Sequence, residues 1–466
     1  MSRKKEIIPG ATIEDVAAEG KSIARVNDKV VFVDYAAPGD VADLLITKKK
    51  KNYNEATAIR FHQYSTLRAE PFCPHYGVCG GCKWQHLDYD AQLDLKRKQV
   101  IDSLERIAKV AFPEVPPVIR AHKTRYYRNK LEFTFSNRKW LTREQVDSGE
   151  DIDRNALGFH LPGRFDRVLD IEQCFLQEEP SNEIRLALKR FAIENRLEFY
   201  DVLAHTGFLR NLVIRIASTG EIMVIVQAAQ NNRELIGKTM DFLAEKFPGI
   251  SSLYYVVNEK KNDSYFDLEP VLYRGKPDIV EKLEDLEFRI GPKTFFQTNS
   301  EQALKLYSKT REFAALSGSE VVYDLYTGAG SIANFVARQA KKVVGVESVA
   351  EAVDDAAVNS QANGISNTVF VAGDASEILT GEFTEAHGKP DVVIADPPRA
   401  GMHKDVVERL LLLEPARIVY VSCNPATQAR DAALLDQKYE IAAVQPVDMF
   451  PHTHHVENIL LFKRRS

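Results

Sequence analysis

The sequence predicts an α/β protein in three parts, the last of which is an open, doubly wound sheet. From about residue 300 onward, short apolar runs alternate with helical segments, which is the pattern of a parallel sheet covered by helices. Before that, the first part carries short strand-like runs separated by glycines, which favours a small β-barrel. A chain of 466 residues is also too long for one core. We therefore expect a barrel over residues 1–64, a mixed α+β central domain over 65–285 and the doubly wound domain over 286–466.

The composition is that of an ordinary folded protein. Hydrophobic residues make up 44% of the chain and charged residues 27%, and no apolar run approaches the ~20 residues that a membrane helix needs. The start, Met1–Glu6, is basic, but no apolar segment follows it, so we expect no signal peptide and a cytoplasmic protein without a membrane partner. The formal charge of -5 argues against a general polycation, although local basic patches still suit nucleic acid. Nothing in the sequence indicates an obligate protein partner.

The first part is expected to be an OB-like barrel, a fold often used to bind nucleic acid. Its strand-length runs are Val30–Val33, Val41–Ile46 and Ala56–Ile59. A run of four lysines, Lys48–Lys51, follows the second of them. This run suits either a solvated hairpin tip or a contact with phosphates.

Four of the five cysteines form a candidate metal centre. Cys73, Cys79 and Cys82 have the spacing C-x5-C-x2-C, and glycines between them allow one loop to bring three thiolates together. Cys174 is the candidate fourth ligand, and His75 is a weaker alternative. Four thiolates suit a [4Fe-4S] cluster or structural zinc, and the three-plus-one spacing favours iron–sulfur.

The central domain combines a helix, a basic segment and a hairpin. Residues 88–110 have helical periodicity, with Leu93, Val100, Leu104 and Ile107 on one stripe. The segment from Arg120 to Lys130 interleaves cations with tyrosines and has no acidic residue. Because cations hold phosphates while aromatic rings stack on bases, this segment predicts contact with RNA. A hairpin is expected from two apolar runs: 211–216 and 221–226.

The doubly wound domain follows a boundary marked by Lys276-Pro277 and Gly291-Pro292. Its predicted strands are 320–325, 342–346, 368–371, 391–395, 417–422, 440–444 and 456–463. The carboxyl ends of such strands are where an open α/β sheet places its ligands and its chemistry.

The cofactor half of the site is expected at the first of these strand ends. The loop Asp324–Ser331 is rich in glycine and lies between a strand and a helix, so a ligand can approach its backbone. Glu347 ends the next strand, about 20 residues further on, where an acid meets ribose hydroxyls. The loop is neither G-x-G-x-x-G nor a P-loop, which favours a ribose without phosphates, as in S-adenosylmethionine. Asp374 is expected near the adenine, and Asp396 closes the pocket.

The second half of the site is a lone thiol. Cys423 lies in Ser422–Pro425, at the end of the strand next to the one that precedes Asp396. A single cysteine at a strand end is often a small buried apolar residue. The Asn-Pro turn that follows breaks the strand, and this favours an accessible nucleophile instead.

These motifs together resemble the RNA uracil-5-methyltransferases, of the RlmD/RumA type that acts on 23S rRNA. The resemblance covers essentially the whole chain. It rests on the barrel, which is similar to a TRAM domain, on the cysteine loop with its distant fourth cysteine, and on a series of motifs in the right order. These motifs are Phe295–Asn299, Asp324–Gly330, Asp396–Arg399, Ser422–Pro425 and His455–Asn458. The sequence departs from the family at Tyr326-Thr327, where the family often has Phe-Cys, and at Ser331, where it has Asn.

The resemblance implies a Rossmann-like, class I methyltransferase domain and a role for each matching residue. Cys423 is implied to be the nucleophile and Glu457 the base, and the four cysteines are implied to bind a [4Fe-4S] cluster. The residues expected to contact S-adenosylmethionine are Gln297, Tyr326, Ser331, Glu347, Asp374 and Asp396.

The chemistry of uracil explains why both a thiol and an acid are needed. C5 of uracil is a poor nucleophile until a thiolate adds to C6 and places electron density on C5. C5 then takes the methyl group, and a base must remove its proton so that the thiolate leaves. The reactive thiolate predicts a polar, partly exposed site for Cys423, and the target base must be splayed out of its stack.

Three alternatives remain open from the sequence. An amino-directed methyltransferase also uses Asp-Pro-Pro, but it carries an aromatic residue where Arg399 stands and has no need of Cys423. An RNA-binding iron–sulfur protein without catalysis is a second alternative, against which the intact Cys423, Glu457 and Asp396 argue. Within the favoured class, tRNA is the alternative to 23S rRNA as substrate.

Overall fold

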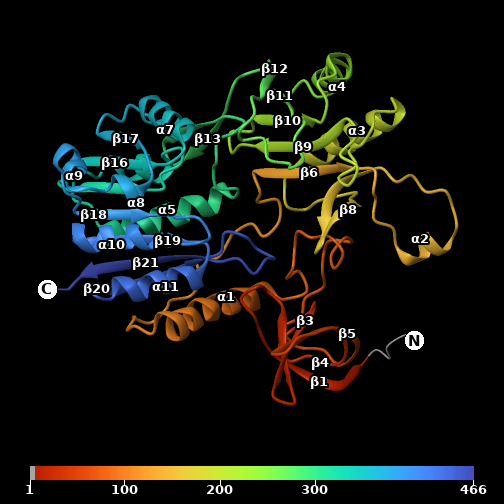
Figure 1. Ribbon diagram of the computed structural model, residues 1–466, viewed down its shortest axis with the longest axis horizontal. Coiled ribbons are helices and arrows are strands. Elements are labelled where there is room, and N and C mark those ends of the chain that lie inside the picture. The colour runs from red at the N-terminus through yellow and green to blue at the C-terminus, as the bar shows by residue number, and fades with distance from the viewer. Residues whose placement is uncertain (1–5, 466) are drawn as a thin grey trace.

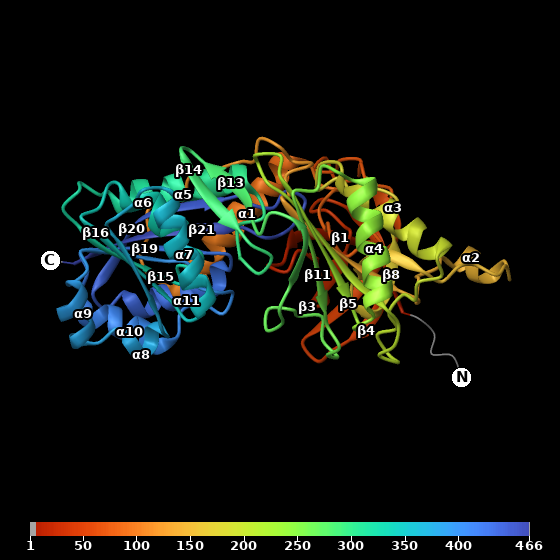
Figure 2. The same ribbon diagram turned by 90° about the horizontal axis from the view of Figure 1, so that it is seen from above.

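The computed structural model describes residues 6–465 and divides into a barrel, a central sheet and a C-terminal sheet (Figure 1). Viewed from above, the C-terminal sheet with its helices lies at one end of the molecule, and the central sheet and the barrel lie at the other (Figure 2). The basic start at Met1–Lys5 and the last residue of the predicted third domain, Ser466, lie outside the described residues. Within residues 6–465, no helix combines the length and the apolar character needed to cross a bilayer.

The N-terminal part is a closed five-stranded barrel, as the sequence predicts. Its strands, in the order β1-β2-β3-β5-β4, are β1 (Ile7–Val16), β2 (Ser22–Val26), β3 (Lys29–Asp34), β4 (Val41–Lys49) and β5 (Tyr53–Gln63). Alternate side chains such as Ile13, Val31 and Leu44 fill the interior, because successive residues of a strand point to opposite faces. Lys48–Lys51 lie exposed around the β4–β5 turn, and Lys48 pairs with Glu55 at 3.0 Å.

Helix α1 (Tyr89–Ser103) begins at Asp88, whose side chain accepts the Asp90 backbone N–H, and it packs on the C-terminal sheet. Its last turn is a π-helical segment, Leu104–Ala108. Val100 and Leu104 are buried as the predicted stripe requires, but Ile107 is 44% exposed. The π turn explains this difference, because it rotates later side chains out of the 3.6-residue register.

The central domain is built on a seven-stranded sheet in the order β12-β11-β10-β9-β6-β7-β8. The predicted hairpin is present as the antiparallel pair β9–β10. The strands are β6 (Lys130–Ser136), β7 (Ala156–Leu161), β8 (Arg164–Asp170), β9 (Leu209–Ile216), β10 (Ile222–Ala228), β11 (Ser252–Val257) and β12 (Val271–Gly275). The helices are α2 (Arg143–Asp147), α3 (Ser181–Glu194) and α4 (Arg233–Lys246).

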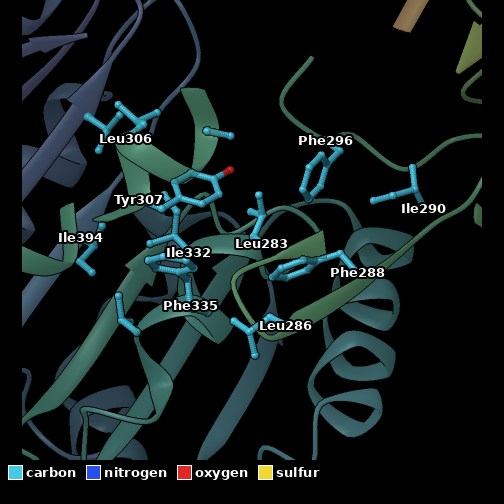
Figure 3. Packing of buried hydrophobic residues seen from close by; sticks show 14 of the residues in the cluster. Leu283, Leu286, Phe288, Ile290, Phe296, Leu306, Tyr307, Ile332, Phe335 and Ile394 are labelled. Atoms are coloured by element: carbon cyan, nitrogen blue, oxygen red, sulfur yellow. The ribbon is translucent and has the colours of Figure 1, made fainter. Parts of the chain in front are cut away.

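A two-stranded hairpin, β13 (Ile279–Leu283) and β14 (Leu286–Ile290), leads from the central domain into the last one. Its apolar face is buried against helices of the C-terminal domain. Figure 3 shows Leu283, Leu286 and Phe288 of the hairpin gathered with Ile332 and Phe335 in one cluster. The hairpin therefore fixes the linker Gly291–Asn299, which carries the predicted cofactor contact Gln297.

The C-terminal domain is the predicted doubly wound sheet, in the order β17-β16-β15-β18-β19-β21-β20. Its first five strands pair in parallel, and β21 and β20 pair antiparallel at one edge. The strands are β15 (Val321–Leu325), β16 (Lys342–Glu347), β17 (Thr368–Ala372), β18 (Val392–Ala395), β19 (Arg417–Ser422), β20 (Tyr439–Val447) and β21 (Glu457–Arg464). The helices are α5 (Ser300–Ala314), α6 (Ser331–Ala337), α7 (Ala350–Ala362), α8 (Ala375–Ile378), α9 (Gly381–His387), α10 (Lys404–Leu413) and α11 (Pro425–Leu435). The fold class predicted from the sequence is confirmed.

Candidate active site

The glycine loop after β15 forms one wall of a deep cavity. Tyr326 and Gly330 have positive φ angles of 63° and 74°, so the backbone turns sharply before α6 begins. At Gly330 a Cβ atom would lie 2.9 Å from the side chains of Ala356 and Asn334, so only glycine lets α6 and α7 approach this closely. The Gly328 N–H donates to the Glu347 carboxylate at 3.1 Å. The glycine loop and Glu347, which the sequence predicts to bind the same ligand, are therefore in direct contact.

The cavity has a volume of about 650 Å³ and lies at the carboxyl ends of the strands. A cavity of this size suits a ligand as large as S-adenosylmethionine. It brings together seven of the eight residues that the sequence assigns to catalysis and cofactor binding: Gln297, Tyr326, Ser331, Glu347, Asp396, Cys423 and Glu457.

Asp374 lies outside this lining. Its carboxylate accepts hydrogen bonds from the Ser376 N–H at 2.8 Å and the Ser376 hydroxyl at 2.6 Å, and so caps α8. These hydrogen bonds lower the pKa of Asp374. Its expected contact with adenine stays a prediction.

The two loops that carry Asp396 and Cys423 are tied to each other. The Asn424 side chain donates to the Arg399 carbonyl at 3.1 Å, and the Thr427 hydroxyl donates to the same oxygen at 3.2 Å. Asn424 also accepts the Ala426 N–H and caps α11, whose first residue is Pro425. The Asn-Pro turn therefore both ends the strand and holds the neighbouring loop.

The Cys423 thiol is partly exposed in an acidic environment. Burial raises its pKa to about 11, and the nearby Glu457 and Asp396 carboxylates add to the shift, while Arg399 opposes it. The site is polar and accessible, as the sequence predicts. The thiol is nevertheless protonated at neutral pH in the ligand-free protein, so ionisation must accompany binding of the substrates.

Glu457 is brought beside Cys423 by strand pairing. It begins β21, which pairs with β19 so that Asn458 lies opposite Ser422. The residue is 5% exposed, and burial together with the Asp396 charge raises the pKa of its carboxyl to about 8. A carboxylate with a raised pKa is a stronger base than an exposed one, which suits proton abstraction.

The segment that leads into Glu457 is anchored by residues 83–96, which lie between the barrel and the central sheet in the sequence. Lys96 of α1 donates to Asp448 at 2.5 Å, with both side chains 0% exposed, and the Tyr89 hydroxyl donates to the same carboxylate at 2.8 Å. The Lys83 and Trp84 backbone N–H groups both donate to the His452 carbonyl, at 2.9 and 3.0 Å. These long-range contacts fix the direction in which the chain enters β21.

Sequence reasoning missed several residues that line the cavity. Asp324 is buried at the end of β15, and Tyr307 of α5 donates or accepts a hydrogen bond with Ser331 at 3.1 Å. The exposed aromatics Phe266 and Phe295 and the half-buried His455 also line it. Asp324 could have been found from its place in the glycine motif, whereas Phe266 comes from another domain and carries no local signal.

The four predicted cysteines meet around a second cavity of about 190 Å³. Cys79, Cys82 and Cys174 are close enough for their charges to interact, and burial raises the pKa of Cys79 and Cys174 to about 12. His75 also lines this cavity, but its Nε2 accepts the Glu172 N–H at 3.1 Å. Across residues 6–465, no three His, Cys, Asp or Glu side chains lie close enough to hold a metal ion.

Part of the basic segment Arg120–Lys130 packs inside the protein and is not exposed to solvent. Tyr127 is buried and donates to the Pro451 carbonyl at 3.0 Å. Arg125 lies over the ring of Phe72, with its guanidinium carbon 3.9 Å from the ring centre, yet stays exposed. His122 and Lys123 are also exposed. Arg125 is thus exposed toward solvent, whereas Lys123 pairs with Glu178 at 2.9 Å and the buried Tyr127 ring is not available for stacking.

Comparison with known proteins gives two matches to family models. The model described as tRNA (Uracil-5-)-methyltransferase matches residues 278–465, and the TRAM domain matches residues 10–59. The chain is 56% identical over 454 residues to an "uncharacterized RNA methyltransferase" of Bacteroides thetaiotaomicron, covering 97% of this chain and 100% of that one. It is 51% identical to a protein of the same description from Porphyromonas gingivalis, covering 97% and 99%.

A solved structure is similar over the whole chain. The tRNA (uracil-54, C5)-methyltransferase of Pyrococcus abyssi, in complex with S-adenosyl-L-homocysteine, superposes with a TM-score of 0.76. It is 30% identical in sequence, and the match covers 97% of this chain and 99% of that one. The chain therefore belongs to the family of S-adenosylmethionine-dependent RNA uracil-5-methyltransferases, with a TRAM domain at its N-terminal end.

Proposed function

We propose that this protein methylates C5 of a uracil in RNA through a covalent bond between Cys423 and C6. The observation that carries the proposal is the shared cavity, in which Cys423, Glu457 and Asp396 meet the glycine loop and Glu347. For this chemistry a thiol, a proton-accepting carboxylate and the methyl donor must all reach the same uracil, and this cavity has room for that arrangement.

Each step has a group in the cavity. The Cys423 thiolate adds to C6, and the electron pair of the 5,6 double bond moves toward C5 and O4. C5 then forms a bond to the methyl group of S-adenosylmethionine, whose sulfur keeps the electron pair of the broken bond. Glu457 accepts the proton from C5, the double bond re-forms and the C6–S bond breaks, which returns the thiolate.

The donor is proposed to lie along the glycine loop. Glu347 would accept hydrogen bonds from the ribose hydroxyls, and Gln297, Tyr326, Ser331 and Asp396 would line its amino acid end and its sulfur. The carboxylate of Glu347 already fixes the loop through the Gly328 N–H, so the donor would meet a preformed wall.

The four cysteines are proposed to hold a [4Fe-4S] cluster, with zinc as the alternative. The fit is supported by the donor set, since all four thiols line one cavity. The cluster would hold the loop whose Lys83 and Trp84 N–H groups fix His452. Iron and acid-labile sulfide analysis of the purified protein tests this, and stoichiometric zinc without iron would contradict it.

The RNA is proposed to be 23S rRNA, from the resemblance carried by the cysteine loop together with the barrel. The match to the tRNA-modifying enzyme of Pyrococcus abyssi favours tRNA as the second candidate. The exposed cations Lys123 and Arg125 suit the phosphates of either RNA.

Mapping of 5-methyluridine in rRNA and tRNA, from cells with and without this gene, tests the function and separates the two substrates. A modified uridine that disappears from 23S rRNA alone supports the proposal. A loss from tRNA alone would replace rRNA by tRNA. Unchanged 5-methyluridine in both RNAs, with purified protein inactive on both, would contradict the function.

A further inference from the structure

The catalytic cavity holds more acidic groups than the proposed reaction uses. Six carboxylates line it against two permanent cations, Lys293 and Arg399. The carboxylates are Asp324, Glu347, Glu351, Asp355, Asp396 and Glu457. Asp324 is 1% exposed, and no step of the methyl transfer uses it.

Three of the carboxylates converge because of the sheet order. Asp324 is the next-to-last residue of β15, Asp396 directly follows β18 and Glu457 begins β21, and these strands are ordered β15-β18-β19-β21 across the sheet. Leu325 and Ala395 are paired neighbours on β15 and β18, so the acids beside them face one edge. Cys423, which follows β19, lies between the Asp396 and Glu457 strands.

The environment of these acids opposes their ionisation. Burial raises the pKa of Asp324 to about 7, of Asp396 to about 7 and of Glu457 to about 8, and Asp396 adds to the shift of the other two. Asp324 accepts a hydrogen bond from the Thr327 hydroxyl. The Glu457 carboxylate lines the cavity and accepts no hydrogen bond within residues 6–465, although the residue is only 5% exposed. Arg399 is a cation near Glu457, but it only partly offsets the effect of burial and of Asp396.

The reaction requires a positive charge at this place. The methyl group must point at C5 of the base, Cys423 must reach C6, and Glu457 must reach the C5 proton. The donor sulfur therefore lies beside Glu457 and Cys423 during transfer. That sulfur is cationic in S-adenosylmethionine and neutral in S-adenosylhomocysteine, which is otherwise the same molecule without the methyl group.

This inference rests on the proposed function. We propose that the carboxylates of Asp324, Asp396 and Glu457 distinguish the positively charged sulfur of the methyl donor from the neutral sulfur of the product. The site then holds cationic S-adenosylmethionine in preference to its neutral product. Methyl transfer removes the charge, because the sulfur keeps the bonding electron pair. Glu457 loses its cationic neighbour at the step at which it must accept the C5 proton, so it becomes a stronger base when it is needed.

The sign of the pH dependence follows from linkage. A bound cation favours the ionised carboxylates, so binding of S-adenosylmethionine releases protons, and its affinity rises as the pH passes through about 6 to 8. The neutral sulfur of S-adenosylhomocysteine does not favour the ionised carboxylates, so its binding should not strengthen with pH in this way. Among the other groups around these acids, burial keeps Tyr307, Tyr326 and Cys423 protonated between pH 6 and 9 and keeps His455, with a pKa of about 4, deprotonated, and it also raises the pKa of Asp355. Arg399 stays cationic, and Glu347, Glu351, Asp355 and Lys293 complete the charged lining.

Calorimetric titration of the full-length protein without RNA tests the inference. S-adenosylmethionine, S-adenosylhomocysteine and sinefungin, which carries an ammonium group in place of the methylated sulfonium, are compared at pH 6 and 9 in two buffers of different ionisation enthalpy. We expect the affinity ratio of S-adenosylmethionine to S-adenosylhomocysteine to rise about tenfold for each unit by which the cation lowers a carboxyl pKa. Proton release should accompany both cationic ligands and not the neutral one.

A matched pair of variants assigns the effect to the cavity. Asp324→Asn removes one charge with little change of shape, and it should reduce the affinity ratio at pH 9 several-fold. Asp405→Asn removes a carboxylate that is 59% exposed on α10, and it should leave the ratio unchanged.

Two results would overturn the inference in different ways. If the affinities of the cationic and neutral ligands for the wild-type protein depend on pH in the same way, with no difference in proton release, the carboxylates do not distinguish the two sulfurs. This result would leave the proposed methyltransferase function unaffected. Absence of binding by all three ligands rejects the proposed function itself. Because these readouts come from the wild-type protein, they do not depend on whether Asp324→Asn folds.

Discussion

The buried Lys96–Asp448 pair predicts a large loss of stability from one substitution. Both side chains are 0% exposed, the ammonium lies 2.5 Å from Asp448 Oδ1, and burial lowers the pKa of Lys96. Lys96→Met keeps the length of the side chain but leaves the Asp448 charge with only the Tyr89 hydroxyl and the Phe450 N–H as donors. Removing one partner of a buried pair costs about 3–5 kcal/mol.

The loss of folding free energy can be measured as a fall in melting temperature. For a domain of about 150–250 residues, 1 kcal/mol shifts the midpoint by about 2–4 °C, so the C-terminal domain should melt roughly 6–20 °C lower. Differential scanning calorimetry of Lys96→Met measures this. Methylation should also fall, because Asp448 anchors the segment that leads to Glu457.

Lys98 provides the matched control on the same helix. It pairs with Asp15 at 2.8 Å and Asp102 at 2.6 Å, but its side chain is 42% exposed. Exposed pairs contribute about 0–1 kcal/mol, so Lys98→Met should melt within about 4 °C of the wild type. Lys96→Met combined with Asp448→Asn removes both charges and should melt above the single variant. If Lys96→Met melts no lower than Lys98→Met, the reasoning about the buried pair is wrong.

Further predictions concern the catalytic groups and the cysteines. Cys423→Ala should abolish methylation while titration still shows binding of S-adenosylmethionine, and residual turnover would remove Cys423 as the nucleophile. Glu457→Gln should accumulate a denaturation-resistant protein–RNA adduct on a gel, because the C5 proton stays in place; rapid release of product would count against Glu457 as the base. Alkylation of Cys423 by iodoacetamide in the ligand-free protein should quicken about tenfold per pH unit from 7 to 10, since the thiolate forms as the pH rises toward a pKa of about 11, and a rate that is already maximal at pH 7 would contradict this environment. Cys174→Ser should lose iron and melt at a lower temperature, whereas Cys423→Ala should keep its iron, and equal iron in both would exclude Cys174 as a ligand.

Much of the C-terminal fold can be predicted because its signals are local. Buried parallel strands are continuous apolar runs, and each of β15, β18 and β19 is followed directly by the glycine loop, Asp396 or Cys423. Residues with reactive or charged side chains therefore lie at the carboxyl ends of these strands, so the sequence alone predicts that the glycine loop, Asp396 and Cys423 lie close together. The meeting of Glu457 with Cys423 follows from one antiparallel pairing, which the sequence does not encode locally.

The sequence pattern does not reveal contacts between segments that lie far apart in the chain. Lys96 and Asp448 are 352 positions apart, and a lysine on a helix is ordinarily expected to face solvent. Phe266 reaches the cavity from the central domain. In the basic segment, Tyr127 turns inward to donate to Pro451, and composition cannot separate such a ring from one that stacks on a base.

The covalent step is tested most directly with RNA that contains 5-fluorouridine in place of uridine. Fluorine cannot be removed as a proton, so the reaction should stop after methyl transfer with the base still bound to the thiol. We expect mass spectrometry of the digested complex to find the methylated 5-fluorouridine on the peptide that contains Cys423, only when S-adenosylmethionine is present. Methylation of ordinary RNA by the wild-type protein, with no adduct at Cys423 on the fluorinated RNA, would contradict the proposed mechanism.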